Sequence, residues 1–205
     1  MAATWLPSSG PALRGRSADH HAVTTYVAML RAVNVGGRKL PMAELRALVA
    51  SLGFGDVRTY VQSGNLVFEG KGKPVDLAVT LADAITADRR FDVPVVVRTA
   101  AELAEVVAAN PFAAVGVDPD AEPRRFHVTF LGSVPAASAV GDLAAATERY
   151  RPDTFRWEGS HVYLDIPGGY GETKLTNALF ERKLGVTATT RNWRTVTTLA
   201  AMAAS

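Results

Sequence analysis

The chain contains no cysteine, no long apolar run and no strong excess of charge of one sign. Without cysteine, disulfides, thiolate catalysis and cysteine-ligated metals are excluded. No apolar run approaches the roughly 18 residues that a membrane-spanning helix needs, so we expect no membrane partner. No targeting signal is recognisable, and we therefore expect a cytoplasmic protein. The net charge of +2 is too small to indicate nucleic-acid binding, which usually shows a concentrated basic stripe.

What the chain does contain is an ordinary globular composition, with 48% apolar and 20% charged residues in a length of 205. That length supports one large core or two small ones. Residues 1–21 include Pro7, Gly10, Pro11 and Gly15, and we interpret them as a flexible tail. The histidines and carboxylates lack the spacing of metal ligands, so no metal site is expected.

Apolar patterning divides the first half into six elements. We expect a buried strand over 23–33, a helix that begins near Pro41 and ends at Gly53, and a hairpin whose strands, 57–62 and 66–70, flank Ser63-Gly64-Asn65. A helix over 75–90 and a strand over 93–99 complete this half. The order β-α-β-β-α-β is that of the split βαβ, or ferredoxin-like, motif.

The same order returns after a linking helix. Thr99 and Glu102 form a capping box for that helix, which Asn110-Pro111 ends. We then expect a strand over 124–132, a helix over 136–149, a hairpin turning at Gly159-Ser160, a helix over 172–184, a strand over 186–190 and a final helix from Asn192. The predicted fold is α+β, with two ferredoxin-like halves, each an antiparallel sheet with helices on one face. The predicted units are a tail (1–21), a first half with the linking helix (22–110) and a second half (111–205).

This topology brings separate polar segments together at one rim of each sheet. In the first half, strands one and two run in the same direction, so residues 34–39 should face residues 62–65. In the second half, residues 168–174 (GGYGETK) should lie close to residues 189–193 (TTRNW). Each half is therefore expected to have one polar, glycine-rich rim.

The two ends of the folded region resemble a known bacterial family. The run LRAVNVGGRKLPMAELRALVASLGFGDVRTYVQSGNLVF and the run TKLTNALFERKLGVTATTRNWRTVTTL are similar to the opening and closing signatures of the family catalogued as domain of unknown function 1697. The resemblance covers the chain from about Val23 onward and implies a duplicated ferredoxin-like fold. It does not point to any particular activity. The matching motif residues are Asn34, Gly36, Gly37, Tyr60, Ser63, Gly64, Asn65, Lys174, Asn177, Arg191, Asn192 and Trp193.

The first rim has two interpretations. Gly36 and Gly37 permit positive φ and close approach to the backbone, and Arg38 adds positive charge near a helix start. This combination suits a phosphate or carboxylate ligand, but it also suits a plain strand-to-helix turn. Ser63, Gly64 and Asn65 suit a hairpin tip, and Ser63 is not favoured as a nucleophile because no base is implied beside it.

The second rim suggests an anion pocket formed by Lys174, Arg191 and the backbone from Gly169 to Glu172. Glycines followed by a lysine at a helix start can hold an anion, and the guanidinium of Arg191 suits phosphate or carboxylate. Asn192 is expected to cap the last helix. Alternatively, Lys174 is a surface residue beside a glycine turn, and Arg191 pairs with an acid such as Glu172.

A third candidate surface is a strand face of the second half. We expect His127, His161, Tyr163 and Asp165 to share one face, with His127 beside Tyr163. RNA-recognition modules carry aromatic residues on the corresponding strands, but their signature is absent here and the other sheet could cover this face.

These features predict a protein that binds a small anionic or nucleotide-like ligand at its glycine-rich, basic rims. The candidate ligand-binding residues are Asn34, Gly36, Gly37, Arg38, Ser63, Gly64, Asn65, Gly169, Lys174, Asn177, Arg191 and Asn192. The alternatives are an enzyme acting on a small phosphorylated or carboxylated compound, with catalytic residues that the sequence does not identify, and a nucleic-acid-binding module. The sequence indicates no particular cofactor.

Overall fold

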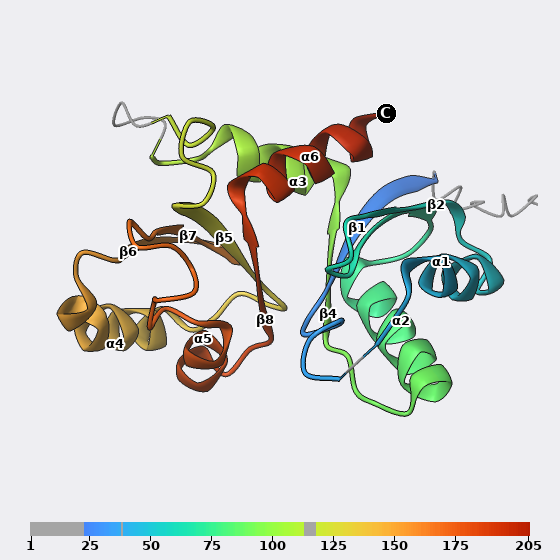
Figure 1. Cartoon of the computed structure of the whole chain (residues 1–205), viewed down its shortest axis with the longest axis horizontal. Coiled ribbons are helices and arrows are strands. Elements are labelled where there is room, and N and C mark those ends of the chain that lie inside the picture. Colours follow the sequence, from blue (N-terminus) through green and yellow to red (C-terminus); the bar gives the residue numbers. More distant parts are fainter. Residues whose placement is uncertain (1–22, 38, 113–117) are drawn as a thin grey trace, which may run out of the picture.

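The computed structural model describes residues 23–37, 39–112 and 118–205, and it contains two four-stranded antiparallel sheets with helices packed on them (Figure 1). The predicted tail and the candidate residue Arg38 lie outside the described residues. Within the described part, no helix is both long enough and apolar enough to cross a membrane.

The first half is a ferredoxin-like unit, as predicted. Its elements are β1 (Thr24–Leu30), α1 (Met42–Ser51), β2 (Gly55–Tyr60), β3 (Asn65–Gly70), α2 (Pro74–Arg89) and β4 (Val95–Thr99), and its sheet has the order β2-β3-β1-β4. Helices α1 and α2 cover one face of this sheet. Their apolar stripes, which include Leu45, Leu81 and Ile85, pack on alternate residues of β1 such as Ala28 and Leu30.

The second half repeats this topology. Its elements are β5 (Phe126–Leu131), α4 (Ala137–Thr147) with a 3₁₀ turn (Glu148–Tyr150), β6 (Thr154–Glu158), β7 (His161–Asp165), α5 (Asn177–Leu184) and β8 (Ala188–Asn192). The sheet order β6-β7-β5-β8 corresponds strand for strand to that of the first half. The predicted duplicated α+β fold is therefore confirmed.

Helix α5 begins later than the sequence pattern predicts. Its first residue is Asn177 rather than residue 172, and the side chain of Thr176 caps the helix. The intervening segment folds back in turns, in which Gly169 N donates to Ile166 O and Glu172 N donates to Gly169 O. Lys174 therefore lies in a loop before the helix, and the expectation that it stands at a helix start is wrong.

Two further helices, α3 (Ala100–Ala108) and α6 (Trp193–Ala204), follow the last strand of each half and lie side by side across the sheets (Figure 1). The predicted capping box of Thr99 and Glu102 is present, and Asn192 accepts from Thr195 N as the predicted cap of α6. Helix α6 packs on β1 and β3 of the first half. The two halves thus share a central core, which contains Val27, Met29, Val67, Val96, Leu103, Phe126, Val128, Phe130, Tyr163, Trp193, Val196 and Leu199.

The register of β5 corrects one prediction about the second sheet. Val128 lies opposite Tyr163, and His127 lies opposite Leu164. Residues directly opposite each other in an antiparallel pair share a face, so Tyr163 points into the central core with Val128, whereas His127 lies on the other face. The expectation that His127 and Tyr163 are side by side is wrong, and the face with the predicted aromatic residue is buried between the sheets.

Candidate functional site

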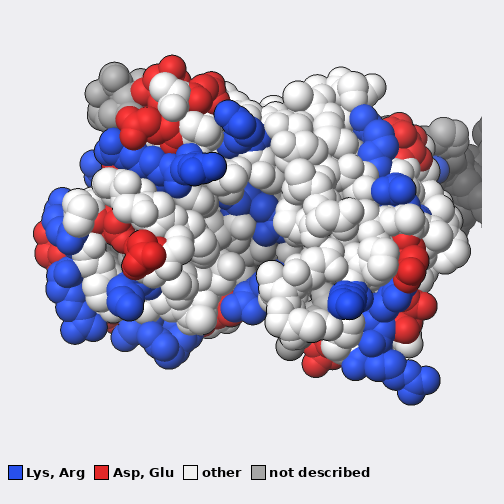
Figure 2. Space-filling model, in the orientation of Figure 1, with Lys and Arg blue, Asp and Glu red and all other residues white. Residues whose placement is uncertain are grey.

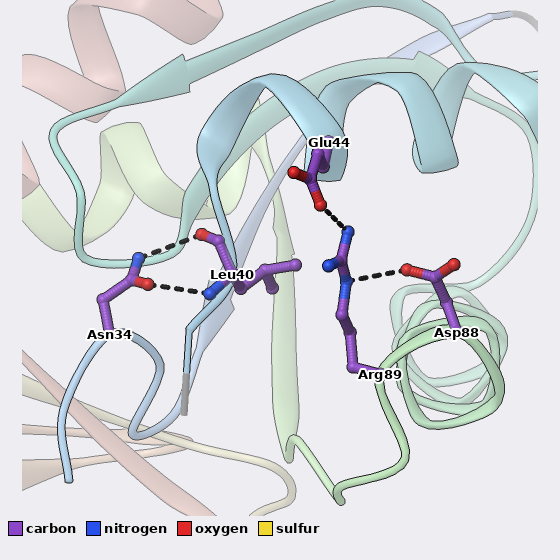
Figure 3. Close-up of polar contacts among 5 residues, drawn as sticks. All are labelled: Asn34, Leu40, Glu44, Asp88 and Arg89. Carbon is purple, nitrogen blue, oxygen red and sulfur yellow. Dashed lines mark hydrogen bonds and ion pairs between the residues drawn. The ribbon is translucent and has the colours of Figure 1, made fainter. Parts of the chain in front are cut away.

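The first rim is held together by Asn34. Its Nδ2 donates to Leu40 O at 3.0 Å, and its Oδ1 accepts from Leu40 N at 2.8 Å (Figure 3). The same Nδ2 also donates to Gln62 O, 2.7 Å away. The predicted proximity of this loop to the hairpin tip is therefore confirmed. Gly36 and Gly37 have positive φ, +58° and +86°. Because both N–H bonds of the Asn34 side-chain amide are donated to backbone carbonyls, one in its own loop and one in the hairpin, this residue stabilises the turn.

An ion-pair cluster fixes the helices next to this rim. Arg89, at the end of α2, contacts the carboxylates of Glu44 on α1 and Asp88 on its own helix (Figure 3). Its guanidinium therefore joins the two helices that cover the first sheet.

The hairpin tip of the first half is also a closely packed structural element. Asn65 is fully buried, and its Nδ2 donates to Tyr60 O and to Ser63 Oγ. Gly64 has φ of +70° in the predicted turn, and a Cβ at this position would lie 2.8 Å from Leu30 Cβ. In the described part of the chain, no histidine is bonded to Ser63, so nothing there activates its hydroxyl.

Arg191 lies in the interface between the halves, where its donors are all occupied. Its Nε donates to Asn65 Oδ1 at 2.5 Å, and Nη2 donates to Leu30 O at 2.7 Å, with Ser63 O and Gly64 O at 3.3 and 3.4 Å. Nη1 donates within β8, to Thr189 Oγ1 and Thr190 O. A guanidinium has five N–H bonds, and these contacts occupy all of them.

The environment of Arg191 differs from the one that the sequence suggested. Desolvation lowers the pKa of Arg191 to about 10, so the side chain remains a cation at neutral pH. Its partners are carbonyl, amide and hydroxyl oxygens, and in the described residues neither Glu172 nor any other carboxylate pairs with it. Arg191 therefore joins the two halves, and its guanidinium does not face an open pocket.

The other two candidates near this rim, Lys174 and Asn177, lie in different environments. Lys174 is exposed and lies outside the lining of the cavity described below. Asn177 accepts from Thr190 Oγ1 at 2.6 Å, a contact that joins α5 to β8. Neither Lys174 nor Arg191 is among the residues that line this cavity.

A cavity does exist at the second rim, and we call it the basic cavity. It has a volume of about 640 Å³ and is lined by residues 121–125, residues 167–169, Asn192 and Arg194. The start of β5, the end of β7 and the end of β8 meet here, because both neighbours of β5 run antiparallel to it. The predicted residues Gly169 and Asn192 are part of this lining.

The charged side chains of the basic cavity are mostly arginines. Arg125 forms a bidentate pair with Asp165, at 2.5 and 2.9 Å, and these hydrogen bonds raise the pKa of Arg125. Arg124 and Arg194 are exposed, and neither has an ion-pair partner among the described residues. The lining residues Asn192 and Arg194 lie at the N-terminal end of α6, where the helix dipole favours an anion. Figure 2 shows many basic side chains over the second half, at left.

A buried histidine lies directly behind the basic cavity. His127 is 7% exposed, and its Nδ1 is 3.3 Å from Arg125 O. Its ring packs on Tyr170, with the ring centres 5.0 Å apart. Burial lowers the pKa of His127 from its ordinary value of 6.5, so the imidazole is neutral at pH 7. Nδ1 donates to the carbonyl in that state, which leaves Nε2 without its proton.

Sequence reasoning missed the two free arginines of the cavity. Arg194 follows the predicted cap Asn192 by two residues, and Arg124 is the first residue of the predicted strand. Both therefore lay next to the rim that the topology identified. The missing step was to extend the rim to the start of β5, which an antiparallel neighbour places beside the ends of β7 and β8.

Comparisons with known proteins identify a family and a fold. The family model described as Protein of unknown function (DUF1697) matches residues 23–163. A solved structure of the conserved bacterial protein SP0830 from Streptococcus pneumoniae superposes with a TM-score of 0.66 at 21% sequence identity, covering 90% of this chain and 100% of that one. No curated protein matches the chain. At this identity the likeness shows the fold alone.

Proposed function

This chain belongs to the family of proteins of unknown function DUF1697, and we propose that it binds a small anionic compound in the basic cavity. The observation that carries the proposal is that Arg124 and Arg194 are without ion-pair partners among the described residues although they line one cavity. Of the charged residues in this lining, three are arginines and one, Glu122, is acidic. Because Asp165 neutralises Arg125, the two free guanidiniums provide the positive charge.

The geometry favours a ligand with a phosphate or carboxylate group. Guanidinium groups bind these planar or multidentate anions through parallel N–H···O bonds. Arg194 also lies in the first turn of α6, where backbone amides and the helix dipole favour an anion. A volume of about 640 Å³ falls within the range of about 300–1,000 Å³ that is typical of small-molecule sites. A nucleotide-like compound fits both the charge and the size.

The proposal is tested by titrating the purified protein with inorganic phosphate and with adenosine monophosphate, followed by amide NMR shifts. We expect saturable shifts at the amides of residues 121, 122, 124, 125, 168, 169 and 192–195. Arg194→Ala or Arg124→Ala should weaken binding roughly ten- to a hundred-fold, as expected for a lost hydrogen bond to a charged group. The matched control is Arg182→Ala, which removes an exposed arginine of α5 outside the cavity. Equal ligand affinities in Arg194→Ala, Arg124→Ala and the control Arg182→Ala would refute the proposal.

An enzymatic version of this function has one specific candidate residue. His127 is held neutral directly behind Arg125, and its Nε2 has the form of a general base. Turnover of phosphorylated or carboxylated compounds, lost in His127→Gln but with binding retained, would distinguish an enzyme from a binding protein. A nucleic-acid partner is the third expectation, and a salt titration with mixed oligonucleotides tests it, because binding to phosphate backbones weakens steeply with salt.

A further inference from the structure

The two halves place an arginine at equivalent positions, and each arginine grips the opposite half. Arg98 is the fourth residue of β4 and Arg191 the fourth of β8, and each precedes the cap of the following helix. The Nη2 of Arg98 donates to Leu131 O at 2.6 Å and Ser160 O at 3.0 Å. Arg191 makes the equivalent contacts with the end of β1 and the tip of the first hairpin. The contacts are therefore reciprocal.

The arginines differ in how many of their donors are used. All five N–H bonds of Arg191 have acceptors, but Arg98 donates only three, the third from Nη1 to Val97 O. Its Nε–H and its second Nη1–H have no acceptor within the described ranges. The reason lies in the sequence, because the position of Thr189, which accepts from Arg191, is occupied by Val96 in the first half. Arg98 is nevertheless only 7% exposed.

Arg98 lines a groove between the halves. The groove is lined by one side of α2, by residues 94–98, by residues 132–134 with Ser160, and by residues 185–187, and its volume is about 720 Å³. Its walls carry the exposed apolar side chains of Val75, Val79 and Val134, which are 59%, 56% and 65% exposed. We call it the valine groove. Glu102 also lines it, but its carboxylate is bound to Thr99 N at the start of α3.

The equivalent position on the opposite side of the molecule carries a salt bridge between the halves. There, Arg31 at the end of β1 forms a 2.8 Å ion pair with Glu181 of α5. The residue that corresponds to Arg31 after β5 is Gly132, which has no side chain to form such a bridge. Saturated donors and a salt bridge thus mark one side, whereas unused donors and exposed valines mark the other.

From these contrasts we infer that the valine groove binds a small apolar monocarboxylate, with its hydrocarbon part against Val75, Val79 and Val134 and its carboxylate on the Nε–H and Nη1–H of Arg98. In the described part of the chain no carboxylate lies within ion-pair distance of Arg98. Burial lowers the pKa of Arg98 and the more distant charge of Glu102 opposes this, so a carboxylate that binds the guanidinium directly would be the partner that Arg98 lacks. Exposed apolar clusters on soluble proteins commonly mark binding sites. This site is separate from the basic cavity and does not depend on its function.

Decanoate is the probe, and 1-decanol is the uncharged control of equal chain length. We expect decanoate to saturate the protein in calorimetric and methyl-NMR titrations, with shifts at Val75, Val79 and Val134, and to bind at least ten-fold more tightly than decanol. Val79→Glu places a like charge on the exposed wall without touching the core, and it should weaken decanoate binding at least ten-fold. Val35→Glu, at a valine that is 57% exposed and lies outside the groove, should leave decanoate binding unchanged.

Three results would overturn the inference. Equal affinity for decanoate and decanol would show that Arg98 does not receive the carboxylate. An unchanged affinity in Val79→Glu would place the ligand elsewhere, and the absence of saturation at millimolar decanoate would show that the groove binds no such compound. Because Val79 and Val35 are both exposed, their replacement should leave the fold intact. Circular dichroism of each variant checks this before the titration.

Discussion

Replacing Arg191 by methionine should destabilise the protein because this side chain joins the two halves. The variant keeps the apolar stem but removes donors from four oxygens of the first half, namely Asn65 Oδ1, Leu30 O, Ser63 O and Gly64 O. Asn65 and Leu30 are buried, so water cannot replace the lost donors there. A buried acceptor without a partner costs about 1–3 kcal/mol. Two such acceptors therefore give a loss of about 2–6 kcal/mol.

The removal of a desolvated cation offsets part of this loss, because burial lowers the pKa of Arg191 to about 10 and so disfavours its charged form. We expect a net decrease of about 2–4 kcal/mol in the free energy of unfolding, near the usual cost of removing one partner from a buried polar contact. Urea unfolding, followed by tryptophan fluorescence and circular dichroism, measures it. Arg182→Met, on the surface of α5, should change stability by less than about 0.5 kcal/mol.

A double-mutant cycle with Asn65→Ala isolates the central contact. If Arg191 Nε and Asn65 Oδ1 interact as the 2.5 Å distance indicates, the coupling free energy should exceed about 1 kcal/mol. A loss in Arg191→Met no larger than that in Arg182→Met, or a coupling near zero, would refute the reasoning that a reciprocal arginine contact joins the halves.

Three further predictions use the same unfolding assay. Gly64→Ala should lower the free energy of unfolding by more than the left-handed backbone penalty of about 1–2 kcal/mol, because its φ is +70° and the new Cβ would also meet Leu30. Gly36→Ala has open space around it and should cost only that penalty. Equal losses in the two variants would contradict this prediction. Tyr163→Phe removes the 2.8 Å bond to Val106 O and should cost about 1–2 kcal/mol, and no loss would show that this bond is not stabilising. Burial lowers the pKa of His127 below the 6.5 of the unfolded chain, so the unfolded state binds more protons and stability falls as the pH drops below 6.5. In His127→Phe this loss of stability between pH 7 and 5 should be smaller. An identical pH profile would show that other groups cause the loss.

The sequence alone determined the order and most limits of the elements, because those signals are local. Apolar periodicity, the capping box of Thr99 and Glu102 and the cap at Asn192 depend on residues a few positions apart, and all of them are present in the structure. The start of α5 was the exception. There the hydroxyl of Thr173 bonds Asp153, twenty positions away, in a loop that the glycine pattern did not separate from the helix.

Only the tertiary structure decided which polar residues are available to a ligand. The sequence identified Arg191 as a cation at a rim, but its acceptors at Leu30 and Asn65 lie more than 120 positions away, and no local pattern indicates them. The face of His127 likewise depends on the register of β5 against β7, because a shift by one residue exchanges the two faces of a strand. A motif can place a charged residue at a rim, but packing between the halves determines whether its hydrogen bonds are used within the protein or left for a ligand.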